Sequence, residues 1–421
     1  MTGSTLGVWL GQRRVGSLER RGPRRMRFTY APEVVAAEIG APLLSVHLPV
    51  RAEPFAPEPT GVVFDGLLPE DHVRRRVAER LRLPEMDSFA LLERIGRDCA
   101  GAVAVLAEGE APHLEPPAGL DWLEGGRLAE HLLELPTRPF ALDDAGEVRL
   151  SLGGVQGKLL VVRSDGRTAI AAHGHASTHI IKPHLPPAPD LVANEAYCMW
   201  LAAATGVPTA SVRVTRFAEV SALEIARYDR VTNAVGKTLR THQEDGCQAL
   251  GIRSDMKYFD ARRSRQPRWE HIYTAALPYA VSPARLRLGL FDLAVTNFVL
   301  GNSDAHAKNV SLMHLDRRVS VAPAYDIVCT QAYGDRFTRT LGMPIGDRVD
   351  PDTVTIDDVR DLADRLDLGA GGVNRRVSEL VGRIAVHRDE QRARVVATDA
   401  DTSIIAAVDA VIDARSAQLS T

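Results

Sequence analysis

Hydrophobic and polar residues alternate through much of the first hundred positions, which predicts strands interrupted by a few helices. Strands are predicted at 5–18, at 26–30 and, from alternation with a period of two, at 43–50, while 100–107 is either a buried strand or a tightly packed apolar segment. A turn at Gly11 and Gln12 divides the first of these into two strands. Helices are predicted from Pro32, at 70–82, and at 88–96 with Asp87 as its N-cap. We therefore expect a compact α+β domain over residues 1–110.

A cluster of Pro, Gly and Glu at 108–120 marks a domain boundary. Strands are predicted at 148–152, 159–162, 178–182, 211–217 and 221–228. Helices are predicted at 127–135, 190–205, 269–279, 282–300, 355–366, 372–388 and 400–417. The helix at 190–205 has an amphipathic pattern, with Asp190 as its cap and Gly206 at its end. We expect a β-rich lobe over 121–250 and a helical lobe over 251–421.

Composition and charge exclude several classes of protein. The 421 residues are too many for one ordinary core, so we expect two or three domains. A net charge of −3 provides no basic field for nonspecific binding of nucleic acid or anionic membranes. The four cysteines are scattered, which is typical of reduced thiols rather than a zinc site or a disulfide framework. The first residues lack a signal-peptide core, and no run of about 18 apolar residues could span a membrane. We therefore expect a cytoplasmic protein.

The stretch GNSDAHAKNV at 301–310 concentrates polar side chains between two apolar runs. Asp304 and Asn309 have the spacing D-x-x-x-x-N of a kinase catalytic loop. In that loop the Asp accepts the proton of the acceptor hydroxyl and the Asn binds a magnesium ion. The alternative is a polar turn between a helix and a strand, and the motif alone does not decide between them.

A glycine-rich turn, SLGGVQGK at 151–158, joins two strand-like runs. Glycines in such a turn let backbone N–H groups approach phosphates closely. The turn is not a Walker A motif, because Leu152 stands at the first glycine position and Leu159 follows Lys158. The alternative is an ordinary hairpin.

Three charged residues complete the candidate constellation. Lys182 ends a strand, and the following Pro183 suggests an edge strand. A buried ammonium needs a counter-charge, which ATP phosphates or Glu195 of the next helix could provide. Asp326 follows Asp304 at the separation where a kinase has its magnesium-binding Asp. The alternatives are a solvent-exposed lysine, a surface glutamate and a turn aspartate.

The order of these features is that of an ATP-dependent kinase: glycine-rich turn, strand lysine, helix, strand pair, D-x-x-x-x-N and a later Asp. On this interpretation the turn and Lys182 hold the phosphates of ATP, Asn309 and Asp326 hold Mg²⁺, and Asp304 deprotonates the acceptor. A basic stretch at 257–268, KYFDARRSRQPR, is predicted to be a loop; it is either solvated surface or a site for an acidic or phosphate-bearing partner.

The chain resembles the HipA family, the serine/threonine-kinase toxins of bacterial toxin–antitoxin pairs. The resemblance covers nearly the whole chain, through VWLGQRRVGSL, LLSVHLPV, FDGLLPE and LLERIGRDCAGAVAV in the first domain, and SLGGVQGK, HIIKPH, NEAYCMWLA, ARYDR, QEDGCQALG, GNSDAHAKN and APAYDI beyond it. It implies an α+β fold with a two-lobed, kinase-like core after a small N-terminal domain. It makes Asp304 the catalytic base and Ser151 a regulatory autophosphorylation site. The residues that it assigns to the nucleotide are Gly153, Gly154, Val155, Gln156, Gly157, Lys158, Lys182, Ala226, Arg227, Tyr228, His306, Lys308, Asn309, Tyr325 and Asp326.

The resemblance also implies a function and a partner. Family members phosphorylate a protein serine, in the best-known cases on an aminoacyl-tRNA synthetase, which blocks translation. A HipB-like DNA-binding antitoxin inhibits them, so contact with DNA is indirect. Two positions depart from the family pattern: Gly157 replaces an acidic residue, and Ala226 replaces a hinge glutamate. The alternatives are a catalytically weak co-repressor that acts with a DNA-binding partner, and a small-molecule kinase on the same fold.

Overall fold

The computed structural model describes residues 4–22, 25–112, 120–136, 157–171, 175–183, 190–234, 236–369 and 371–420. Ser151, the predicted strand at 148–152 and positions 153–156 of the glycine-rich turn lie outside these ranges. None of the helices in the described part of the chain combines the length and the apolar surface needed to cross a membrane. The four cysteines are buried and unbridged, as the sequence predicts.

An antiparallel sheet and four helices form the N-terminal domain. The sheet has the order β3-β2-β1-β4, built from β1 (Thr5–Leu10), β2 (Arg13–Gly22), β3 (Arg25–Tyr30) and β4 (Val103–Ala107). The helices are α1 (Pro32–Glu38), α2 (Pro57–Asp65), α3 (Asp71–Leu81) and α4 (Ser88–Ile95). The Asp87 side chain accepts a hydrogen bond from the amide of Ala90, which confirms the predicted cap. The domain has its own core, and Phe28 lies at 0% exposure within it.

The strand predicted at 43–50 is wrong, because this segment forms turns. Its alternating apolar side chains Leu44 and Leu48 still enter the core of the N-terminal domain. No ladder partner fixes its backbone; instead Ser45 Oγ and the Val46 amide donate hydrogen bonds of 2.5 and 2.8 Å to Glu244, far along the chain. The alternation therefore reflects burial and not strand pairing.

A second antiparallel sheet, of order β5-β7-β6-β8-β10-β9, forms the β-rich lobe. Its strands are β5 (Trp122–Leu123), β6 (Leu159–Ser164), β7 (Arg167–Ile170), β8 (His179–Pro183), β9 (Val212–Phe217) and β10 (Val220–Ala226), accompanied by α5 (Gly125–Glu134) and α6 (Leu191–Ala204). The prediction that Lys182 and Pro183 lie on an edge strand is wrong, because β8 pairs with both β6 and β10. Pro183 is tolerated because it is the last residue of β8, beyond the Ile181 position where pairing with β6 ends.

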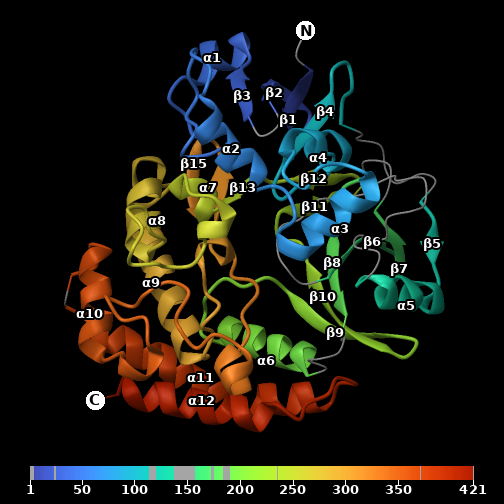
Figure 1. Cartoon of the computed structure of the whole chain (residues 1–421). Helices are drawn as coiled ribbons and strands as arrows, with labels where there is room; N and C mark the ends of the chain where they lie inside the picture. Colours follow the sequence, from blue (N-terminus) through green and yellow to red (C-terminus); the bar gives the residue numbers. More distant parts are fainter. Residues whose placement is uncertain are drawn as a thin grey trace.

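Helix α6 is buried almost all round, so the amphipathic interpretation is wrong. It lies between the β-rich lobe and the C-terminal helices α11 (Val373–Val396) and α12 (Ile405–Gln418). Figure 1 shows α6 directly above these two helices. Asp190 makes no capping bond with its side chain; its Oδ1 accepts a hydrogen bond from the Tyr333 hydroxyl at 3.2 Å. Gly206 has φ of +86°, consistent with the predicted helix end.

Helices dominate the third part of the chain, and α11 and α12 lie at the end of the molecule opposite the N-terminal domain (Figure 1). Besides α11 and α12, they are α7 (Gly246–Leu250), α8 (Trp269–Ala276), α9 (Pro283–Val299) and α10 (Ile356–Arg365). Ser282 caps α9 through the Arg285 amide. A hairpin of β11 (Arg230–Thr232) and β12 (Thr238–Arg240) and a sheet of β13 (Gln243–Asp245), β14 (Ser311–Leu315) and β15 (Arg318–Val321) connect the lobes.

Candidate active site

A cavity of about 850 Å³ lies where the N-terminal domain, the β-rich lobe and the helical lobe meet. The residues assigned from the sequence that line this cavity are Lys158, Lys182, Arg227, Tyr228, Asp304, His306, Lys308, Asn309, Tyr325 and Asp326. Gly157 and Ala226 are described residues but are not part of its lining. Side chains from positions about 170 residues apart in the chain are thus brought to one hollow.

Lys182 bridges two carboxylates at the wall of the cavity. Its Nζ lies 2.7 Å from Glu195 Oε1 and 2.5 Å from Asp326 Oδ1, so the predicted pairing with the helix glutamate is confirmed. Glu195 is 2% exposed, whereas the side chain of Asp326 is 40% exposed toward the cavity. Burial opposes ionisation of Asp326, but Lys182 outweighs it and lowers the pKa of Asp326 to about 2. The backbone of Asp326 has φ of +59°, which is unusual for a residue other than glycine.

Asp304 lies in the loop between α9 and β14. Burial raises the pKa of its carboxyl, and a hydrogen bond from Tyr258 partly opposes this rise. The Asp304 amide donates to Asn302 Oδ1 at 3.1 Å, and Asn309 Nδ2 donates to the Asp304 carbonyl at 3.0 Å. The loop is therefore tied by its own amide side chains. Asn302, to which the sequence assigned no role, is one of these ties.

His306 and Lys308 both line the cavity, and the protein itself binds the ammonium of Lys308. His306 is buried, and burial together with Lys257 lowers its pKa to about 3, so the ring is neutral. Lys308 Nζ lies 2.6 Å from Asp245 Oδ2 and 3.2 Å from the Gly66 carbonyl. Its ammonium thus fastens the loop to the start of α7 and to the end of α2, in addition to lining the cavity.

Glu70, Lys257 and Tyr258 are among the cavity residues that were not identified from the sequence. Glu70, next to α3 of the N-terminal domain, accepts a hydrogen bond of 2.8 Å from Lys257 Nζ, and its Oε1 lies 3.7 Å from Lys308 Nζ. Tyr258 donates to Asp304 Oδ1. The only sequence signal was indirect: Glu70 ends FDGLLPE, and the other two begin the basic stretch at 257–268. The N-terminal domain therefore contributes directly to this cavity.

Tyr228 and Tyr325 form the wall next to β10. Their ring centroids are 6.0 Å apart, and the Tyr325 hydroxyl donates to the Lys308 carbonyl at 2.6 Å. The side chain of Arg227 extends to Asp98 of the N-terminal domain and to Asp229. At this predicted hinge, the charged group of Arg227 is thus held by carboxylates.

The donor set fits a magnesium ion shared with phosphates. No group of three or more His, Cys, Asp or Glu side chains with metal-binding geometry occurs among the described residues. Mg²⁺ usually takes only one or two protein oxygens beside waters and substrate phosphates. Asp326 offers a carboxylate, and Asn309 offers its amide oxygen, since its nitrogen is bonded to Asp304.

The chain matches two sequence models of known domains. One, described as the HipA-like C-terminal domain, matches residues 150–390, and the other, the HipA N-terminal domain, matches residues 6–106. The chain belongs to the HipA family.

Relatives of the HipA family agree with this assignment. Y4mE of Sinorhizobium fredii is 37% identical over 96% of this chain and 94% of its own. The serine/threonine-protein kinase toxin HipA of Shewanella oneidensis is 31% identical over 69% of this chain and 67% of its own. The solved complex of Shewanella oneidensis HipA, HipB and operator DNA contains a chain with a TM-score of 0.83 and 27% identity, covering 98% of this chain and 96% of that one. The predicted α+β, kinase-like fold with its N-terminal domain is thereby confirmed.

Proposed function

We propose that this HipA-family chain is an ATP- and Mg²⁺-dependent serine/threonine protein kinase. The observation that supports the proposal best is the bridge of Lys182 to Glu195 and Asp326 on the cavity that also contains Asp304 and Asn309. Phosphoryl transfer depends on positioning and charge neutralisation, and this set contains the groups for both. The relative named as a serine/threonine-protein kinase toxin supports the same reaction class.

Each side chain has a part in the proposed reaction. Lys182 and Lys158 bind the phosphates; burial and the neighbouring Lys182 lower the pKa of Lys158 to about 8. Asp326 and Asn309 would hold Mg²⁺, which would supply neutralisation of the phosphate charge. Asp304 accepts the proton of the acceptor hydroxyl, and its raised pKa suits a general base. Glu195 orients Lys182, while the segment around Tyr228 borders the nucleotide.

The substrate and the partners follow from the family. We infer that the acceptor is a protein serine, on an aminoacyl-tRNA synthetase, so that translation stops in the cytoplasm. A HipB-like antitoxin would bind the chain and connect it to DNA, since the HipA of Shewanella oneidensis was solved in a complex with HipB and operator DNA. We also propose Ser151 as an autophosphorylation site that switches the enzyme off.

The test is a phosphoryl-transfer assay followed by phosphoproteomics. Purified wild type with labelled ATP and Mg²⁺ should phosphorylate itself, and Asp304→Asn should lower the rate by about a hundred- to ten-thousandfold. Asp316→Asn is the control, because Asp316 is exposed and lies in the turn after β14. Phosphoproteomes of cells that express wild type or Asp304→Asn are then compared, and the substrate is the protein phosphorylated only with wild type. A wild type that binds no ATP but still represses transcription with a DNA-binding partner would favour the co-repressor.

A further inference from the structure

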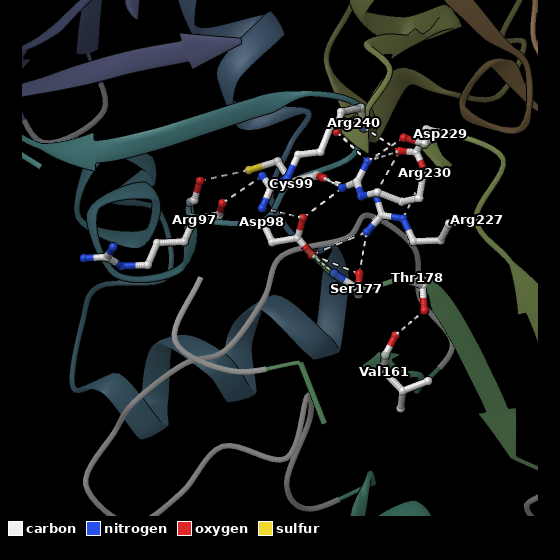
Figure 2. Close-up of polar contacts among 12 residues, drawn as sticks. Arg97, Asp98, Cys99, Val161, Ser177, Thr178, Arg227, Asp229, Arg230 and Arg240 are labelled. Atoms are coloured by element: carbon white, nitrogen blue, oxygen red, sulfur yellow. Dashed lines mark hydrogen bonds and ion pairs between the residues drawn. The ribbon is translucent and has the colours of Figure 1, made fainter. Parts of the chain in front are cut away.

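A buried ionic cluster joins the N-terminal domain to the segment that follows β10. We call it the hinge clamp: Asp98 of the N-terminal domain with Arg227, Asp229, Arg230 and Arg240 (Figure 2). Asp98 Oδ1 lies 2.8 Å from Arg230 Nη2 and 3.4 Å from Arg240 Nη2. Asp98 Oδ2 lies 3.6 Å from Arg227 Nη1. One carboxylate thus faces three guanidinium groups.

Backbone groups of the same loop complete the hinge clamp. The carbonyl of Cys99 accepts from Arg227 at 3.2 Å and from Arg230 at 3.1 Å, and the carbonyl of Gly101 accepts from Arg230 at 2.7 Å. The Gly101 amide donates to Asp229 Oδ2 at 2.8 Å. Figure 2 shows the guanidinium groups lying between this loop and the segment at 227–230. Because the hinge clamp contains more arginines than aspartates, these carbonyl oxygens stabilise the positive charge that the carboxylates leave uncompensated.

The hinge clamp is buried, and its charges depend on one another. The side chains of Asp98, Arg227 and Arg230 are 0%, 2% and 1% exposed. Burial alone would raise the pKa of Asp98, but the three arginines lower it to about 2. Removing one partner from a buried ionic cluster leaves charges uncompensated and displaces their neighbours. Within the hinge clamp, Asp98 is the acidic side chain that comes from the N-terminal domain.

The segment that the hinge clamp holds forms one side of the cavity. Arg227, Tyr228 and Asp229 line the cavity, and the Arg227 amide donates to the Thr178 carbonyl at 3.0 Å. Asp98 Oδ2 also accepts bonds from the amide and hydroxyl of Ser177, at 3.1 and 2.9 Å. The same carboxylate therefore holds Ser177, just before β8, and Arg227, just after β10.

Gly101 allows the loop to come this close. Its φ is +68°, and an added Cβ would lie 2.6 Å from the amide nitrogen of Gln243. A side chain there would push the loop away from β13. Gly109, also in the N-terminal domain, has φ of +87° with no atom within 4 Å of the added Cβ. Both glycines have a positive φ, but only at Gly101 would an added Cβ meet a neighbouring backbone.

We propose that Asp98 is a positioning residue that fixes residues 226–229 against the nucleotide, so that the N-terminal domain sets the affinity for ATP. The inference rests on the proposed kinase function for the identity of the ligand. It assigns the N-terminal domain a part in the active site that the D-x-x-x-x-N motif and the strand lysine do not contain. Asp98 acts through Arg227 and Arg230, because Asp98 does not itself line the cavity.

The experiment compares the full chain with Asp98→Asn, Asp98→Glu, Gly101→Ala and the matched control Gly109→Ala. Calorimetry with ADP and Mg²⁺ below the unfolding temperature of every variant measures affinity. We expect Asp98→Asn and Gly101→Ala to bind between about ten- and a hundredfold more weakly. Asp98→Glu should recover part of the loss, and Gly109→Ala should bind as wild type does. In steady state, KM for ATP should rise while kcat at saturating ATP is retained.

Hydrogen exchange of the ligand-free proteins provides the second measurement. Amides at 226–230 should exchange faster in Asp98→Asn and Gly101→Ala than in Gly109→Ala, while α9 stays protected. If affinity and exchange in both variants equal those of the control, the inference is overturned. If Asp98→Asn does not fold, Gly101→Ala decides. A wild type that binds no nucleotide overturns the proposed function, and the positioning of this segment by Asp98 then stands or falls on exchange alone.

Discussion

The Tyr258 hydroxyl donates a hydrogen bond of 2.5 Å to Oδ1 of Asp304. Tyr258 is 44% exposed, and its ring meets His306 edge to face at 4.9 Å between centroids. A general base must lie within hydrogen-bond reach of the proton that it accepts. A phenol hydroxyl therefore stands, in the ligand-free chain, where the proposed mechanism requires an acceptor hydroxyl.

Tyr258→Phe should move the acidic limb of the pH–rate profile to higher pH. Burial raises the pKa of Asp304, and the bond from Tyr258 lowers it. Without that bond the pKa rises further, so the base becomes protonated at higher pH and activity falls earlier on acidification. The measurement is kcat/KM against pH for both proteins. Tyr273→Phe is the control, since Tyr273 donates to Asp367, outside the cavity lining. An unchanged acidic limb would contradict the prediction.

Asp304→Asn should stabilise the protein at neutral pH while it removes activity. Burial raises the folded pKa of Asp304 above its unfolded value, so the protonated carboxyl favours folding at low pH. This contribution is lost as pH rises through the folded pKa, and the ionised group then costs stability. The neutral amide avoids that cost. Thermal unfolding at pH 7 should show a higher Tm for the variant, and the difference should vanish below about pH 4, the unfolded pKa. A lower Tm at pH 7 would contradict this.

Much of the secondary structure, and several residues that meet at the candidate site, could be predicted from the sequence. Short strand-like runs around a turn placed β1 to β3, and Asp87 was identified as a cap because capping is local. Lys182 pairs with Glu195 as the sequence predicted, and Asp326 joins them from the far end of the motif order. Such predictions succeed where the signal lies within a few residues or in a fixed sequence of motifs.

Long-range contacts explain what the sequence did not show. Glu70 and Lys257 meet across 187 residues, and neither neighbourhood contains a pattern that names the other. Pairing with β6 and β10 places β8 inside its sheet, whereas Pro183 considered alone had suggested an edge strand. The segment at 43–50 alternates because its side chains are buried, whereas Glu244 holds its backbone. Tertiary partners, and not local propensity, decide such features.

Acid should weaken the hinge clamp, and Asp98→Asn should make the free energy of unfolding less dependent on pH. The folded pKa of Asp98 is lowered to about 2, so its stabilisation is present above the unfolded pKa and is lost as pH falls through the folded value. The lost free energy of unfolding is roughly 2 kcal/mol between about pH 4 and pH 2. Urea unfolding across this range measures it in both proteins. Equal pH dependence of the two proteins would show that Asp98 is not ionised in the folded state.

Lys182→Met should destabilise the chain, and Glu195→Gln should recover part of that loss. Without the ammonium, Glu195 is left buried and unpaired beside Asp326, which costs about 3–5 kcal/mol. The double variant has no buried charge at position 195, so the two effects should not add, and urea midpoints of the four proteins measure the coupling. Arg376→Met with Asp292→Asn is the control cycle, because that partly buried pair joins α11 to α9 outside the cavity lining. Both cycles should show coupling in stability, but only Lys182→Met should abolish ADP binding. Additive losses in the first cycle would mean that Lys182 does not neutralise Glu195.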